Sequence, residues 1–310
     1  MVTLKLNIDA LGDLGNLDRQ ANTFSSFLSD IRTKVPRFKW LSTPPTAVPE
    51  GFHALHYMIF LVFCDFLQPE SSLSTSDAVN CILKAFPGHE VDYGAIIIVC
   101  LELAAQIPYH HPSQQKLARL LWCMGRSTER LNQGGWNNGE LEAFYQTLGI
   151  DLTDANLQPR EESDPEYSSD RFVNYVAFVA NVLAIGIFRP WSRTPLSILS
   201  RALERRHNEE TPEVRDAWVL GAAQLVLWHG QGLFKLVLSP EDLVEDDKVP
   251  RWLVGEPEEH GPIELERWVL WRDRFNEVAG NETYGAECRD VAKKAAEIMD
   301  VIKRSMLFKV

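Results

Sequence analysis

Residues 171–188, RFVNYVAFVANVLAIGIF, are the stretch that most constrains the fold. Their apolar side chains occur all round a helical wheel, so a helix here must be buried on every side. Asn174 and Asn181 are the exceptions. They are seven positions apart and share one face to within about 20°, and Asp170 extends the same stripe by one turn. Because an unpartnered buried amide costs about 1–3 kcal/mol, this stripe requires a polar network, water, or a polar or metal-bound ligand in a cavity.

Helical periodicity runs through almost the whole chain and predicts an all-α fold, a single large bundle over residues 1–310 with residues 171–188 at its centre. An acidic loop, residues 151–165, separates an N-terminal half (1–150) from a C-terminal half (166–310). Ser74, Ser113 and Thr211 are predicted N-caps, with Pro212 at a first helical position. We predict helices at 16–34, 50–67, 75–86, 90–107, 113–132, 138–148, 166–188, 194–206, 212–237, 262–279 and 283–306.

Composition excludes several classes of protein. The net charge is −12 and no long Lys/Arg run occurs, so we expect no nucleic-acid binding. The apolar runs are too short for a membrane span, and no secretory signal begins the chain. Five scattered cysteines without zinc spacing indicate reduced core thiols and a cytoplasmic location. Phosphate-loop, dinucleotide-binding and nucleophile-elbow motifs do not occur.

Residues 57–70, YMIFLVFCDFLQPE, predict an aromatic-rich apolar helix that ends in Asp65, with Glu70 just beyond it. Carboxylates at the mouth of an apolar helix suit Mg²⁺, which takes oxygen ligands and shares them with substrate phosphate. A solvated helix C-terminus is the simpler interpretation.

Glu50, His53 and His56 have the spacing found in di-iron bundles. Such bundles need a second copy of the motif on another helix, and the sequence has none. Packing or capping histidines are therefore the plainer interpretation, and a contribution of Glu70, His53 or His56 to a metal site stays open.

Combined with the stripe on residues 171–188, the acidic helix end resembles a class I terpene cyclase, in which an acidic motif on an early helix and an Asn-led motif on a later one grip a diphosphate through magnesium. The resemblance implies Mg²⁺ bound by Asp65, Asp170, Asn174 and Asn181. It implies clamps on the diphosphate, with Arg126 and Arg130 in the upstream position and Arg267, followed by Trp268, near the C-terminus. Aromatic side chains, among them Phe60 and Phe178, would face the carbocation.

The motifs depart from the usual spelling. Cys64-Asp65-Phe66-Leu67-Gln68 stands where the acidic motif has more carboxylates, and four-residue steps from Asn174 reach Phe178 and Val182 instead of oxygen ligands.

Segments 171–178, 213–228 and 261–275 are similar to an all-helical family of filamentous fungi carried as a domain of unknown function. The chain also resembles the non-canonical fungal sesquiterpene cyclases of the humulene synthase type. That resemblance implies an enzyme of secondary metabolism that ionises farnesyl diphosphate and releases a humulene-type hydrocarbon. It requires the amide side of helix 166–188 to face Asp65 across a cavity.

Two other functions fit the same residues. In one, the chain is a non-catalytic helical protein that binds a protein partner or an apolar ligand, and the asparagines fix the register of the core. In the other, it is a metal-free isomerase or cyclase. A homodimer is compatible with the sequence, and the prenyl chain length and the product are left open.

Overall fold

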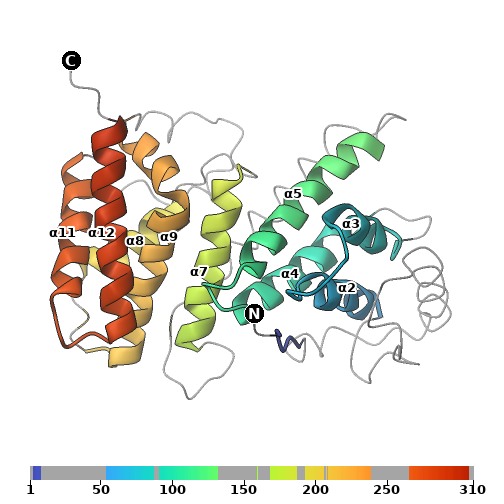
Figure 1. Cartoon of the computed structure of the whole chain (residues 1–310), viewed down its shortest axis with the longest axis horizontal. Helices are drawn as coiled ribbons and strands as arrows, with labels where there is room; N and C mark the ends of the chain where they lie inside the picture. The colour runs from blue at the N-terminus through green and yellow to red at the C-terminus, as the bar shows by residue number, and fades with distance from the viewer. Residues whose placement is uncertain are drawn as a thin grey trace. The chain divides into compact units, whose positions relative to one another are not determined.

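The computed structural model describes residues 3–7, 54–86, 91–131, 159, 168–186, 193–205, 207, 209–238 and 265–306. Over these residues the fold is all-α, with nine helices (Figure 1). The chain divides into two compact units, Met1–Asp151 and Leu152–Val310. The boundary between them falls at the start of the acidic stretch that separates the two halves of the sequence.

The first unit contains α2 (Ala54–Phe66), α3 (Thr75–Leu83), α4 (Tyr93–Gln106) and α5 (Ser113–Leu131). Helix α2 packs against α3 and α4, and α5 packs against the same two helices. Both α2 and α4 are apolar on nearly all sides and supply most of the core of this unit. Side-chain N-caps start two of the helices, since Ser74 Oγ accepts from Asp77 N (3.1 Å) and Asp92 Oδ1 accepts from Ala95 N (3.0 Å).

The second unit contains α7 (Ser169–Ala184), α8 (Arg193–Glu204), α9 (Pro212–Leu238), α11 (Leu265–Ala279) and α12 (Ala286–Met306). Helix α9 packs against each of the other four. Its 27 residues span about 40 Å at 1.5 Å per residue. Large aromatic side chains fill the layers around it, and the fully buried ones are Phe172, Phe178, Phe234, Trp268, Trp271 and Phe275.

Helix α7 is buried without interruption from Phe172 to Leu183, as the all-round apolar pattern predicts. Phe172 sets its contact with α9. The Phe172 ring lies edge-on to Trp218 with ring centroids 4.9 Å apart, and Gly221 leaves the space that the ring occupies, since a Cβ there would lie 2.8 Å from it. This contact fixes which side of α7 faces α9.

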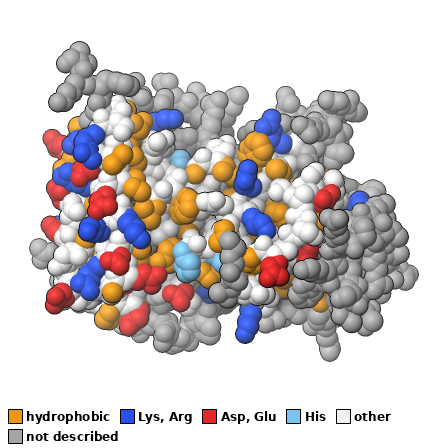
Figure 2. Space-filling view, in the orientation of Figure 1, with side chains coloured by type: hydrophobic (Ala, Val, Ile, Leu, Met, Phe, Trp, Pro, Cys, Tyr) orange, Lys and Arg blue, Asp and Glu red, His pale blue; other side chains and the backbone are white. Residues whose placement is uncertain are grey.

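The outer face of α11 and α12 mixes charges of both signs (Figure 2). Arg272 Nη1 binds Asp300 Oδ1 at 2.8 Å and links the two helices, while Arg274 and Glu277 pair along α11. Beneath these pairs, Trp268 Nε1 donates to Met299 O at 3.4 Å. The solvent side of these two helices carries ion pairs and their core side is apolar, which is the usual pattern for a surface helix.

Nine of the predicted helices are confirmed, with ends that differ by up to four residues. They are the helices predicted at 50–67, 75–86, 90–107, 113–132, 166–188, 194–206, 212–237, 262–279 and 283–306. Helices predicted at 16–34 and 138–148 lie outside the described residues. Ser74 and Thr211 cap their helices and Pro212 begins α9. The N-cap predicted at Ser113 is wrong, because Ser113 is the first residue of α5 and its hydroxyl donates to Leu67 O instead.

Among the described residues, no helix combines the length and apolarity needed to cross a bilayer.

Candidate functional site

Asp65 lies in the last turn of α2 and is 6% exposed. Ser71 Oγ donates to its Oδ2 at 3.5 Å, and the positive charge of Lys116 on α5 acts on the carboxylate. Burial lowers the pKa of Lys116, and the charge of Asp65 partly opposes that shift. Asp65 is thus a buried carboxylate with a cation and a hydroxyl nearby. This setting suits either a buried charge neutralised by Lys116 or a carboxylate that binds a metal.

Two side chains of α5 close the C-terminal end of α2. Lys116 Nζ donates to the carbonyl oxygens of Phe66 (3.0 Å) and Gln68 (3.1 Å), and Ser113 Oγ donates to that of Leu67 (2.5 Å). The last carbonyls of a helix lack partners within the helix, and a lysine also suits the negative end of its dipole. The turn that carries Asp65 is therefore held by α5.

The two amides of α7 lie on the side of the helix remote from α9. Asn174 and Asn181 are about 160° and 180° around the helix axis from Phe172, the residue that contacts α9. They are nevertheless buried, at 8% and 5% exposure. Asn181 Nδ2 donates to Ala177 O on the same helix at 2.8 Å. An amide also carries an oxygen, Oδ1, which is the kind of atom that a hard cation prefers.

The other predicted residues of α7 differ in exposure. Asp170 lies in the first turn and is exposed, so it stands at the end of the amide stripe and not within the buried part. Phe178 is fully buried and lies about 40° from Asn174 around the helix. An aromatic ring therefore accompanies the amides on the same side of α7. In the first unit, Phe60 is also buried, with its ring 6.2 Å from that of Tyr57.

Arg267 forms an ion pair within the second unit. Its Nε and Nη2 bind Oε1 and Oε2 of Glu204 on α8, at 2.6 and 3.2 Å. Trp271 Nε1 donates to the same Oε1 at 2.7 Å, and Ser200 Oγ donates to Oε2 at 3.0 Å. Burial alone would raise the pKa of Glu204, but these hydrogen bonds and the arginine charge hold it below its usual value. Arg267 thus joins α11 to α8, and a role on a diphosphate requires it to leave or share this carboxylate.

The other predicted cations and histidines differ in how far the structure describes them. Arg126 is exposed on α5 and stacks over Trp122, 4.7 Å from the ring centroid. The side chain of Arg130 and the whole of His53 lie outside the described residues. His56 is buried in α2, whereas Glu70 is exposed.

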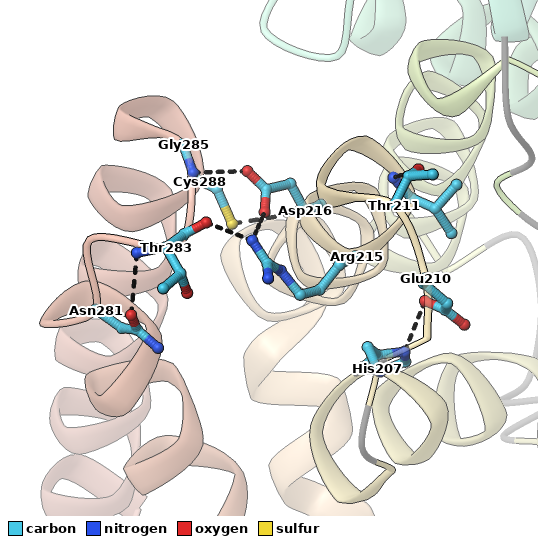
Figure 3. Close-up of polar contacts among 10 residues, drawn as sticks. His207, Glu210, Thr211, Arg215, Asp216, Asn281, Thr283, Gly285 and Cys288 are labelled. Carbon is cyan, nitrogen blue, oxygen red and sulfur yellow. Dashed lines mark hydrogen bonds and ion pairs between the residues drawn. The ribbon is translucent and has the colours of Figure 1, made fainter.

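A polar cluster that the sequence did not predict joins the start of α9 to the α11–α12 connection (Figure 3). Asp216 Oδ2 accepts from Gly285 N at 2.7 Å, at the beginning of α12. Arg215 binds Thr283 O and stacks over the Tyr284 ring at 4.3 Å. A carboxylate at a helix N-terminus is favourable, so this cluster reads as a structural cap supplied by another helix.

His207 and Glu210 form a second polar pair, before α9 (Figure 3). His207 Nδ1 lies 2.8 Å from Glu210 Oε2, and its ring stacks on Trp218 at 6.4 Å between centroids. Arg201 lies over the same Trp218, 4.9 Å from the centroid. Trp218 thereby connects α8, the turn before α9 and, through Phe172, α7.

The cysteines are free thiols, and four of the five are buried, which confirms the prediction of core thiols. Burial first, and the charge of Asp65 second, raise the pKa of Cys64, so it stays protonated and is a poor nucleophile or metal ligand. Considering only the described residues, no cluster of three or more His, Cys, Asp or Glu side chains could hold a metal ion.

The predicted ligands belong to different units, Asp65 to the first and the α7 stripe to the second. The expectation that they meet across one cavity stays a prediction. Lys116 and Glu204 engage predicted site residues but were not predicted, and Ser113 was predicted only as an N-cap. No local spacing indicates these contacts, because the partners lie 46 to 63 positions apart in the chain.

Comparison with known proteins gives a family for the chain. Residues 98–275, more than half of the chain, match the model of the family described as "Protein of unknown function (DUF3632)". The chain belongs to this family, and the segments 171–178, 213–228 and 261–275 all lie within the match. No curated protein matches the chain, and no solved structure does.

Proposed function

We propose that this DUF3632 protein is a magnesium-dependent sesquiterpene cyclase that ionises farnesyl diphosphate and releases a cyclic hydrocarbon of the humulene type. The fungal source and secondary-metabolic setting implied by the sequence resemblance belong to the same proposal. Its residues would be Asp65, Asp170, Asn174 and Asn181 for the metal, and Arg126, Arg130 and Arg267 for the diphosphate.

One observation carries the proposal: a pair of buried amides on the side of α7 away from α9, with Asn181 Nδ2 satisfied by its own helix. Asn181 Nδ2 bonds to Ala177 O on its own helix, and the amide oxygens of the pair would serve the metal. The donor set is made of amide and carboxylate oxygens, which fits magnesium.

The proposed reaction needs no covalent bond between the protein and its substrate. Magnesium, when bound, supplies positive charge that stabilises the diphosphate as a leaving group. Arginine side chains add hydrogen bonds to the same oxygens. The C–O bond breaks with its electron pair leaving on the diphosphate, a new C–C bond forms between the allyl cation and a distal alkene, and a proton lost from the adjacent carbon restores a double bond.

The apolar side chains must then keep water from the cation. Phe178 and Phe60 are buried aromatic rings, on α7 and α2, and an aromatic face stabilises a cation by about 0.5–2 kcal/mol. Replacing either ring by leucine should preserve ionisation and shift the products toward alcohols formed by water capture.

The test compares amide variants with a matched control. Asn174→Ala and Asn181→Ala should lower turnover of farnesyl diphosphate by about 10²–10³-fold, the scale of losing one electrostatic contact to the leaving group, with the free energy of unfolding changed by no more than about 1 kcal/mol. Asn276→Ala, an exposed asparagine on α11, should change neither. Asp65→Ala tests the first unit in the same assay. Variants that unfold more easily and retain activity would refute these roles.

A second candidate function rests on Arg267. Its pairing with Glu204 and Trp271, and the enclosure of the Asp65 turn by Lys116 and Ser113, are what a non-catalytic helical protein with internal polar networks would show. Such a protein would bind a partner or an apolar ligand. In that case Asn174→Ala, Asn181→Ala and Asp65→Ala would lower stability, and no prenyl diphosphate would be consumed.

A further inference from the structure

Residues 3–7, Thr-Leu-Lys-Leu-Asn, are held within the first unit by two glutamine side chains. Gln68 Oε1 accepts from Leu4 N (2.9 Å) and Gln68 Nε2 donates to Leu4 O (3.1 Å). Gln106 repeats the arrangement with Asn7, at 2.9 and 2.8 Å. Each amide therefore pairs with both main-chain groups of one residue, as a neighbouring strand does in an antiparallel sheet.

Both glutamines are oriented by an adjacent helix: Gln68 follows the end of α2, and Gln106 is the last residue of α4. Gln68 Nε2 also donates to Cys64 O at 3.1 Å, and Gln106 Nε2 donates to Glu102 Oε1 at 2.6 Å. In both cases the second acceptor lies four residues earlier, on α2 and on α4. A side chain fixed in this way loses little freedom when it binds a peptide, so the two clamps are preorganised.

The segment itself has the features of a bound extended peptide. Leu4 and Leu6 are half-buried while Thr3, Lys5 and Asn7 are exposed, the alternation of a strand with one side covered. In an extended chain, residues three apart present their main-chain groups to opposite edges. Gln68 and Gln106 therefore grip the segment from its two edges, and the leucines face the unit.

We propose that the ends of α2 and α4 form a binding site for an extended peptide with apolar side chains at two alternate positions, and that the chain's own residues 3–7 are its resident ligand. Recognition of main-chain groups gives the site tolerance at the exposed positions, and the inward pair of leucines gives it selectivity, as in other modes of strand addition. The tether raises the effective concentration of the resident segment, which is why it occupies the site in preference to a free peptide. This inference does not rest on the proposed function.

The test uses the full chain with the resident segment released by Leu4→Asp and Leu6→Asp together. A labelled synthetic peptide, MVTLKLNID, should bind this variant saturably, and at least tenfold more tightly than it binds the unaltered chain, where the tethered segment competes. Adding Gln68→Ala and Gln106→Ala should weaken binding at least tenfold. Adding Gln115→Ala, an exposed glutamine on α5, should leave it unchanged, and a scrambled peptide should not bind.

Absence of binding to the released chain, or equal binding after both glutamines are removed, would overturn the proposal. Amide hydrogen exchange on the unaltered chain provides a check that needs no released variant. Leu4 and Asn7 should exchange more slowly than Lys5, and Gln68→Ala should speed exchange at Leu4 by about tenfold, the worth of one hydrogen bond. Uniform exchange across residues 3–7 would contradict the site, and a concentration-dependent dimer that loses this protection on dilution would place a second copy's segment there instead.

Discussion

Arg267 on α11 and Glu204 on α8 form a two-point ion pair, with Nε to Oε1 at 2.6 Å and Nη2 to Oε2 at 3.2 Å. Trp271 donates to the same carboxylate and lies beneath the guanidinium, whose carbon is 5.2 Å from the ring centroid. The arginine side chain is 15% exposed and the glutamate 27%. The pair is thus shielded enough from water to hold the two helices together. A variant of Arg267 should therefore change the stability of the fold.

Arg267→Ala should lower the free energy of unfolding by about 2 kcal/mol, because it leaves Glu204 partly buried without its cation. Arg274→Ala is the matched control on the same helix, since its pair with Glu277 is exposed, and it should change stability by less than about 0.5 kcal/mol. Urea unfolding followed by circular dichroism measures both. A loss of cyclase activity from Arg267→Ala with unchanged stability would instead assign the arginine to the substrate.

Stability should fall in mild acid because of His229 on α9. Burial first, and the charge of Lys235 second, lower the pKa of His229 to about 4. The unfolded histidine has a pKa near 6.5 and takes up a proton that the folded one refuses. The stabilisation is therefore complete above about pH 6.5 and is lost as the pH falls toward 4, by up to about 3 kcal/mol in total.

Replacing His229 with Gln should flatten the pH dependence of unfolding between pH 4 and 6.5. His110→Gln, at an exposed position, should leave the slope unchanged. Parallel slopes for the unaltered chain and His229→Gln would show that the imidazole titrates alike in the folded and unfolded states.

Gly221→Ala should destabilise the second unit by about 1–3 kcal/mol. The new Cβ would lie 2.8 Å from the Phe172 ring, which is fully packed between α7 and α9, and overpacking of that kind forces the backbone to shift. Gly230→Ala is the comparison, because its Cβ would meet the flexible end of Ile302 at 2.7 Å. It should cost less or be offset by the better helix propensity of alanine. Thermal melting of both variants checks the order.

Local patterns predicted the helices well because most have a helical period and some also have a terminal signal. Ser74 and Thr211 carry short-range capping information, and Pro212 marks the start of α9. Ser113 looked the same from its neighbours, but its hydroxyl is used by Leu67, 46 positions earlier. A contact of that range leaves no trace in local spacing.

Around the candidate site, too, the features set by local periodicity were predictable and the long-range contacts were not. The period of 3.6 placed Asn174, Asn181 and Phe178 on one side of a buried helix, and the structure agrees. The partner of Arg267 could not be read from the chain, because nothing near residue 267 indicates Glu204. Residues 3–7 did contain a signal, an alternation of five residues, but it is shorter than a typical strand and was not predicted as an extended segment.

The decisive experiment is incubation of the purified full chain with farnesyl diphosphate, with and without magnesium, with volatile hydrocarbons and released diphosphate both measured. We expect a cyclic sesquiterpene hydrocarbon of the humulene type, formed with magnesium and lost on its chelation or in Asn181→Ala. No turnover of geranyl, farnesyl or geranylgeranyl diphosphate by the folded protein would contradict it, and hydrocarbon formed equally well without magnesium would remove the metal from the mechanism.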